Sequence, residues 1–152
     1  MNEPVGVVEV EAPREAGHVA AFGGCSLIRL PSFSDHRGVL TVAERNLGLA
    51  FDAVRFFMLF GVPEGERRGG HSLAVSEEVM VAAAGSVTLE VDDGRTCWRV
   101  VLDDPTLAVH VPVGVWSEQH SFTEGAVLLV LASAPFDPDE FDNGRPGRVG
   151  DG

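Results

Sequence analysis

The sequence predicts an all-β protein, built as an antiparallel β-sandwich or β-barrel in a single domain. Apolar and β-branched residues form short runs interrupted by Gly, Pro, Asp and Asn, the residues that favour turns. Many short strands at such close spacing are typical of a sandwich or a barrel. A chain of 152 residues is long enough for one hydrophobic core and too short for two comfortable domains.

The expected strands follow one another from Ser26 to Ala132. Asp93-Gly94 is the clearest hairpin signal, because this dipeptide suits a tight turn between two twisted strands. The runs that we expect to be strands are 26–30, 38–44, 53–62, 77–85, 86–91, 96–102, 106–112, 116–122 and 126–132.

The two ends of the chain have a different composition from its middle. Residues 1–24 are rich in Glu, Ala, Gly and Pro, and we expect this N-terminal arm to be partly disordered. Residues 25–141 hold the strand pattern and form the predicted β-domain. Residues 142–152 are rich in Gly, Asp and Arg with little to bury, which predicts a disordered tail.

Charge and cysteine usage exclude several classes of protein. The net charge of −12 argues against binding to nucleic acid or to anionic membranes, although a local arginine cluster can still hold a small anion. Cys25 and Cys97 lie far apart with no CxxC motif, so neither a disulfide framework nor a structural zinc site is indicated. The N-terminus does not read as a secretory signal, and no apolar run has membrane-spanning length, so we expect a cytoplasmic protein.

The stretch Gly61–Gly85 is predicted to contain the active-site loop. It turns through Pro63 and several glycines, which allow the backbone to bend sharply and to approach a ligand closely. It also brings Arg67 and Arg68 next to His71. Two arginines beside a histidine can hold an anion next to a group that titrates near neutral pH.

An ordered set of motifs resembles one known family. The set comprises residues 34–42 (SDHRGVLTV), 62–65 (VPEG), 68–71 (RGGH), 85–87 (GSV), 91–94 (VDDG), 115–116 (VW) and 126–133 (AVLLVLAS). It resembles the sugar 3,4-ketoisomerases of the cupin superfamily, which act on dTDP-4-keto-6-deoxyglucose in deoxysugar pathways. The resemblance implies a cupin-type jelly-roll antiparallel β-barrel and a homodimer that exchanges N-terminal strands, for which we expect the segment around 26–30 to be used.

The chain departs from the family pattern at identifiable positions. The family carries His-x-His after the double glycine, and this sequence has His71 followed by Leu73. There is no tyrosine in the chain, and Phe57, Met58 and Phe60 stand where the family has tyrosines.

A metal site is not expected. Many cupins bind a divalent ion through His-x-His, a Glu and a later His, and such ligands must converge on one point. Of these four positions only His71 and Glu77 are kept, because Leu73 and Ser117 occupy the other two. We therefore predict no metal and no other cofactor.

The candidate catalytic residues are His71 and Glu77. His71 is the best base, although it can instead simply bond the glycine-rich turn. Glu77 and Glu78 lie on opposite faces of their strand, since side chains alternate. Glu77 shares a face with Val79, which places it either in the barrel mouth, as a desolvated base, or at a surface strand end.

The candidate substrate-binding residues are more widely spread. They are Arg37, Arg67, Arg68, His110, Ser117 and His120. The arginines are suited to a diphosphate, through fork-shaped hydrogen bonds, or are ordinary solvated loop residues. Each of the two histidines either lines the barrel or has a structural role.

The family resemblance and these residues lead to two hypotheses of function. The first is a metal-independent isomerase that moves a carbonyl from C4 to C3 of a dTDP-linked 4-keto-6-deoxy sugar through an enediol, in deoxysugar or natural-product biosynthesis. The alternative is a diverged cupin that binds, cyclises or cleaves a natural-product intermediate. The apolar strand segment RFFMLF favours this alternative, because it makes the wall of the binding site less polar.

Overall fold

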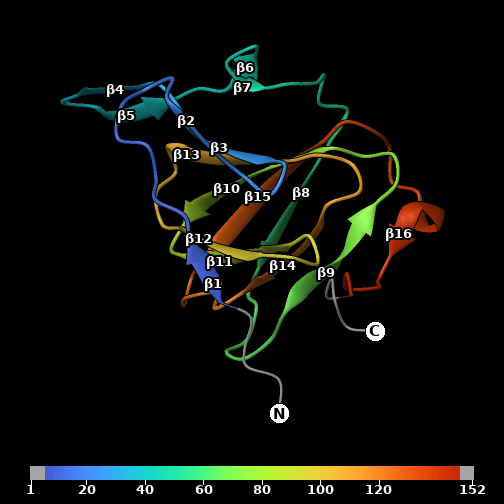
Figure 1. Ribbon diagram of the computed structural model, residues 1–152. Coiled ribbons are helices and arrows are strands. Elements are labelled where there is room, and N and C mark those ends of the chain that lie inside the picture. The colour runs from blue at the N-terminus through green and yellow to red at the C-terminus, as the bar shows by residue number, and fades with distance from the viewer. Residues whose placement is uncertain (1–5, 148–152) are drawn as a thin grey trace.

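The computed structural model describes residues 6–147 and shows two β-sheets packed face to face (Figure 1). Sheet A has six strands, in the order β1 (Val7–Glu9), β12 (Cys97–Leu102), β11 (Val87–Asp92), β14 (Trp116–His120), β9 (Arg68–Leu73) and β16 (Phe141–Asp142). Sheet B also has six, in the order β2 (Val19–Phe22), β3 (Cys25–Arg29), β13 (Leu107–Val111), β10 (Glu78–Ala84), β15 (Val127–Ala132) and β8 (Arg55–Phe60).

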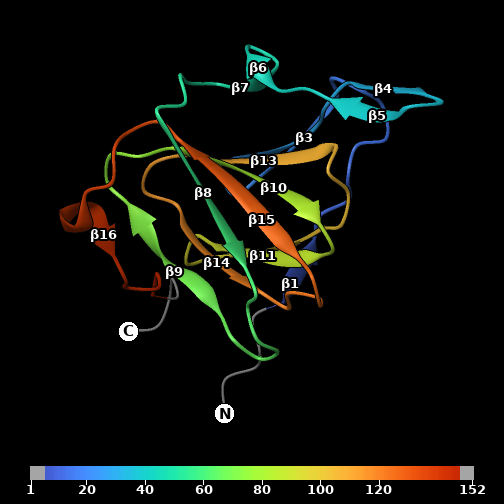
Figure 2. The ribbon, with the colours of Figure 1, turned by 180° about the vertical axis from the view of Figure 1, so that it is seen from behind.

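The remaining elements are small. The hairpin of β4 (Ser32–Asp35) and β5 (Gly38–Thr41) projects from the body in both views (Figures 1 and 2). The strands β6 (Glu44–Arg45) and β7 (Gly48–Leu49) form a second small sheet, and the one helix of the described chain is the 3₁₀ turn η1 (Pro138–Glu140). The pairing within the two large sheets is antiparallel except between β1 and β12. The predicted all-β class is therefore confirmed.

The turn at Asp93-Gly94 joins β11 to β12, as the sequence predicts. The two strands pair in register from Val87 with Leu102 to Asp92 with Cys97. Gly94 has φ +88°, and an added Cβ would lie 2.6 Å from the carbonyl oxygen of Gly147. Glycine is thus required here both by the backbone conformation and by the close approach of the C-terminal segment.

The main core lies between the sheets. The inward side chains of both sheets form one buried cluster, in which the largest members are Leu27, Leu89, Leu102, Leu107 and Leu128. A second cluster, formed by Leu30, Phe51, Val79 and Ala108, covers part of the outer face of sheet B. Strand β10 therefore presents apolar side chains on both of its faces.

The N-terminal arm holds two strands where we expected partial disorder. β2 pairs with β3 at the edge of sheet B, and β1 pairs with β12 at the edge of sheet A. Both strands cover an edge whose backbone groups would otherwise be unpaired, which accounts for their order. Of the predicted arm and tail, residues 1–5 and 148–152 lie outside the described range.

The segment 26–30, expected to exchange with a partner, is paired inside its own chain. β3 is hydrogen-bonded to β2 on one side and to β13 on the other, so both of its edges are occupied. In the described chain, the β4–β5 hairpin makes strand pairs only with itself.

Candidate active site

A cavity of about 350 Å³ opens between the two sheets and contains His71. Its walls come from β8, β9, β10, β14 and β15 and from the segment after β15. The lining residues are Arg55, Phe57, Leu59, Arg68, Gly69, His71, Leu73, Glu78, Met80, Gln119, Val130, Phe136 and Phe141. The lining is thus mostly apolar and includes a small number of ionisable side chains, as ligand sites commonly do.

His71 is placed by a pair of glycines on β9. Gly69 and Gly70 have φ +73° and +75°, and the pairing of β9 with β14 shifts register beside them. An added Cβ on Gly69 would lie 2.6 Å from Oε1 of Gln119. The double glycine therefore lets β9 lie tightly against β14. Part of the predicted active-site loop is in fact strand, since β9 spans Arg68–Leu73.

The imidazole of His71 is half-buried and uncharged at neutral pH. Burial lowers its pKa below the ordinary value of 6.5, against the opposing effects of a backbone hydrogen bond with Gly69 and of the Glu140 charge. The ring of Phe141 contacts it edge-on, with centroids 4.8 Å apart. A neutral imidazole in an apolar cavity is suited to accept a proton.

Glu78, which is not among the site residues predicted from the sequence, faces the same cavity. Its side chain is 6% exposed, and burial raises the pKa of the carboxyl from 4.5 to about 7, while Arg55 opposes and Glu140 reinforces the shift. No hydrogen bond or ion pair of this carboxyl is found within the described chain. A narrow crevice lined by His71, Glu78 and Ser117 adjoins the cavity.

Arg55 brings a partly buried positive charge to this end of the cavity. Its guanidinium carbon lies 5.4 Å from the ring centroid of Phe57 and 5.7 Å from that of Phe136. Its Nε is buried and has no hydrogen-bond partner in the described chain. An unsatisfied buried donor of this kind is available to a ligand.

Glu77, by contrast, lies on the outer face of sheet B. Its Oε1 is 2.9 Å from Nε2 of His110, whose ring is also near Phe51. The structure thus places Glu77 outside the cavity, at the surface end of its strand and not in the barrel mouth. His110 likewise lies outside the cavity, because side chains alternate along β10 and β13.

The remaining predicted binding residues divide between the cavity and other surfaces. Arg68 lines the cavity and Ser117 lies beside His71 in the strand register. Arg67 instead forms an ion pair with Glu118 on the outer face of sheet A. Arg37 lies at the tip of the β4–β5 hairpin, paired at 2.6 Å with Asp35.

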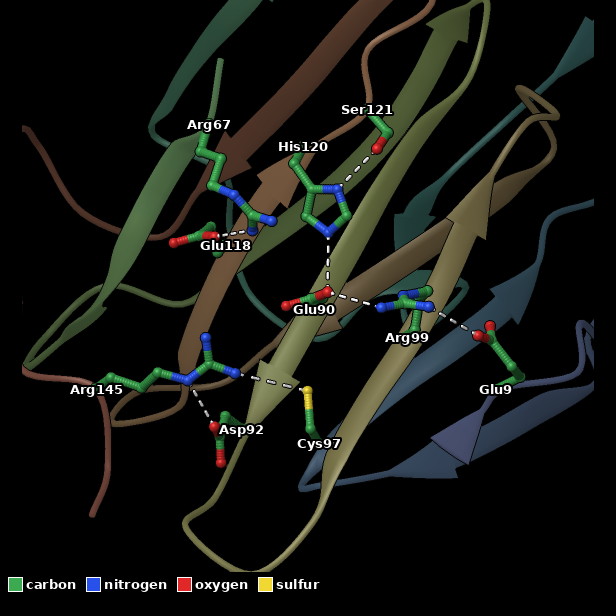
Figure 3. A network of polar contacts seen from close by, with 10 residues as sticks. All are labelled: Glu9, Arg67, Glu90, Asp92, Cys97, Arg99, Glu118, His120, Ser121 and Arg145. Atoms are coloured by element: carbon green, nitrogen blue, oxygen red, sulfur yellow. Dashed lines mark hydrogen bonds and ion pairs between the residues drawn. The ribbon is translucent and has the colours of Figure 1, made fainter. Parts of the chain in front are cut away.

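His120 also points away from the cavity, into a polar network on the outer face of sheet A (Figure 3). Its Nε2 lies 3.0 Å from Oε1 of Glu90, and its Nδ1 lies 2.8 Å from the hydroxyl of Ser121. Burial alone would raise the pKa of Glu90, but bonds from His120 and Arg99 hold it below its ordinary value. This histidine has a structural partner, which supports the alternative interpretation given above.

The C-terminal segment is attached to the same outer face. Nε of Arg145 donates to Oδ2 of Asp92 at 2.7 Å (Figure 3). The guanidinium also lies 4.5 Å from the ring centroid of Trp116. Asp142 belongs to β16, which pairs with β9. The described part of the tail, predicted as disordered, is thus held against sheet A.

A larger and more open groove of about 870 Å³ lies between the turns 61–67 and 120–125. Glu64, Glu66 and Glu124 line it, and their charges disfavour an anionic ligand. The cavity around His71 is therefore the better candidate site.

Neither a metal centre nor a membrane span is indicated by the described residues. Across positions 6–147, no group of three His, Cys, Asp or Glu side chains is arranged to bind a metal ion. In the same range, no helix is long and apolar enough to cross a membrane.

The fold and the cavity agree with comparisons to known proteins. Residues 23–144 match the family described as FdtA, WxcM-like, C-terminal. The TDP-4-oxo-6-deoxy-alpha-D-glucose-3,4-oxoisomerase of Aneurinibacillus thermoaerophilus is 32% identical over 115 residues, which are 76% of this chain and 83% of that protein.

Solved structures of sugar ketoisomerases are also similar. The QdtA sugar 3,4-ketoisomerase of Thermoanaerobacterium thermosaccharolyticum in complex with TDP gives a TM-score of 0.75 at 31% identity, covering 79% of this chain and 88% of that one. The WlaRB TDP-quinovose 3,4-ketoisomerase of Campylobacter jejuni gives 0.77 at 28% identity, covering 81% and 95%. The chain belongs to the WxcM-like family of cupin-type proteins.

Proposed function

We propose that this protein is a metal-independent sugar 3,4-ketoisomerase acting on a dTDP-linked 4-keto-6-deoxy sugar. The observation on which the proposal rests is a neutral histidine, His71, in an apolar cavity of a chain whose relatives are named for this reaction. A natural-product intermediate as ligand is not favoured, since the relatives described above are ketoisomerases.

The reaction needs a base next to the sugar ring. The proton on C3 is acidic because the C4 carbonyl can accept the charge left behind as an enediolate. His71 takes this proton and later returns it to C4, which leaves the carbonyl at C3. Proton transfer of this kind contributes about a hundredfold or more to the rate.

The cavity also has groups that suit the rest of the substrate. Arg68 and Arg55 are cations on its lining, and a guanidinium binds phosphate oxygens through two parallel hydrogen bonds. Phe57, Phe136 and Met80 supply apolar surface against which a deoxysugar ring with its methyl group can pack. A cytoplasmic location, where nucleotide-linked sugars are made, also forms part of the proposal.

A homodimer is the second part of the proposal. The outward side chains of β8 are large, apolar and exposed: Phe56 by 64%, Met58 by 49% and Phe60 by 69%. The projecting hairpin adds Phe33 and Leu40, which are also exposed. Apolar surface of this extent at a sheet edge is typical of a subunit interface, and a second copy of the chain is the proposed partner.

The test of the activity uses purified protein and dTDP-4-keto-6-deoxyglucose in D₂O. Proton NMR should show loss of the C3 proton and formation of the 3-keto product. His71→Asn should lower turnover by about a hundredfold or more, because the base is lost, while TDP affinity changes little.

The pH dependence gives an independent check on His71. Because burial lowers the pKa of His71, the wild-type rate should decline on the acid side only below pH 6.5, where the imidazole becomes protonated. A wild-type protein that leaves the keto-sugar unchanged would refute the proposed function.

A further inference from the structure

The proposed reaction moves protons at oxygen as well as at carbon. When the carbonyl passes from C4 to C3, a C–H bond breaks at C3 and another forms at C4. At the same time the oxygen on C4 gains a proton and the hydroxyl on C3 loses one. If His71 exchanges the carbon-bound proton, a second group has to exchange the proton between the two oxygens.

The chain offers few side chains for this second task. The sequence contains no tyrosine, and Leu73 occupies the position two residues after His71. The ionisable residues on the cavity lining are Arg55, Arg68, His71 and Glu78. Arginine stays protonated in proteins, so the carboxyl of Glu78 is the remaining group there that can both give and take a proton.

The surroundings of Glu78 suit this role. It is almost fully buried, lines the cavity and the adjoining crevice together with His71, and makes no hydrogen bond or ion pair within residues 6–147. A buried carboxyl engaged in holding the fold together would be expected to have such a partner.

Two charged groups act on this carboxyl, Arg55 on β8 and Glu140 at the end of η1. The uncharged imidazole of His71 on β9 lines the same cavity. With its pKa raised to about 7 by burial, the carboxyl is present in both protonation states near neutral pH.

We infer that Glu78 is a second catalytic residue, which transfers the proton between the two substrate oxygens. His71 first removes the C3 proton, which leaves an enediolate with its charge on the C4 oxygen. The acid form of Glu78 then donates its proton to this oxygen, giving the neutral enediol. The resulting carboxylate then takes the proton of the C3 hydroxyl as His71 returns its own proton to C4. Both residues end in their starting states, so atoms and charges balance. This inference rests on the proposed ketoisomerase function.

The experiment compares Glu78→Gln with the wild type and with Glu44→Gln, a matched control at an exposed position on β6. Glu78→Gln keeps the size of the side chain and removes its exchangeable acid proton. We expect kcat to fall by about a hundredfold or more with KM within a few-fold of wild type. Glu44→Gln should behave as the wild type.

Isotope exchange separates catalysis from a structural role. In D₂O the variant should still exchange the C3 proton through His71, so exchange should exceed isomerisation far more than in the wild type. Glu78→Asp, which keeps an ionisable group, should recover part of the turnover. Circular dichroism and TDP binding should show that each variant is folded.

Three outcomes would overturn the inference. The first is a Glu78→Gln variant that keeps the wild-type kcat. The second is a variant in which C3 proton exchange and isomerisation fall by the same factor, as expected if Glu78 has only a structural role. A folded Glu78→Asp variant no more active than Glu78→Gln would also count against it. A wild type without turnover refutes the proposed function and this inference with it, whereas an active wild type with an active Glu78→Gln refutes the inference alone.

Discussion

The buried carboxyl of Glu78 should make the stability of the protein depend on pH in a predictable way. Its pKa is about 7 in the folded protein, against an ordinary value of 4.5. Because the folded pKa is raised, the stabilising contribution is fully present below pH 4.5 and is lost as the pH rises through 7. At about 1.4 kcal/mol per pKa unit, the folded state loses about 3 kcal/mol across this range.

The Glu78→Gln variant should lack this loss. The difference in free energy of unfolding between variant and wild type should therefore grow by about 3 kcal/mol in the variant's favour between pH 4.5 and pH 8. Urea unfolding followed by tryptophan fluorescence at several pH values measures it, since Trp98 and Trp116 are both in the described fold. Other titrating groups cancel in the difference.

The control for this prediction is Glu44→Gln, which should show a difference that stays near zero at every pH. A constant difference for Glu78→Gln across the same range would show that the carboxyl titrates normally. That result would contradict both the raised pKa and the chemical role derived from it.

Three other predictions concern metal content, assembly and backbone strain. Protein purified without added metal should contain far less than one equivalent of any transition metal, because Leu73 and Ser117 replace two cupin ligands. A stoichiometric metal whose removal abolishes turnover, detected by elemental analysis, would contradict this. Met58→Lys should give a monomer mass by light scattering at micromolar concentration where the wild type gives a dimer, because it puts a charge on the apolar face of β8. A wild-type monomer would contradict the proposed homodimer. Gly85→Ala should lower the free energy of unfolding by about 1–3 kcal/mol in urea titrations, because φ is +66° and the new Cβ would lie 2.8 Å from Cα of Ala126. Unchanged stability would show that this turn can relax.

Much of the fold could be predicted because its turns are specified locally. Asp93-Gly94 demands a tight turn, and the alternating runs on either side of it became β11 and β12. The strands in the N-terminal arm could not be predicted in the same way. β1 has three residues, all exposed, and forms because β12 presents an unpaired edge that only the assembled sheet creates.

Only some residues of the candidate site could be predicted from local sequence patterns. His71 and Arg68 were found from the glycine-rich motif, and both line the cavity. The choice between Glu77 and Glu78 could not be made, because β10 is apolar on both faces. Val79 packs on the outer cluster and Met80 in the main core, so alternation separates the two glutamates without saying which one points inward.

The contact of β16 with the cavity affects when the candidate site can form during synthesis of the chain. His71 lies near the middle of the chain, yet Phe141 contacts its ring and Glu140 accepts a hydrogen bond from the backbone of Ser76 at 3.2 Å. A ribosome releases the N-terminal part of a chain first, so His71 is synthesised before the residues around Phe141 that cover its ring. The burial that lowers the pKa of His71 is therefore complete only once the C-terminal segment has docked and Phe141 contacts the ring.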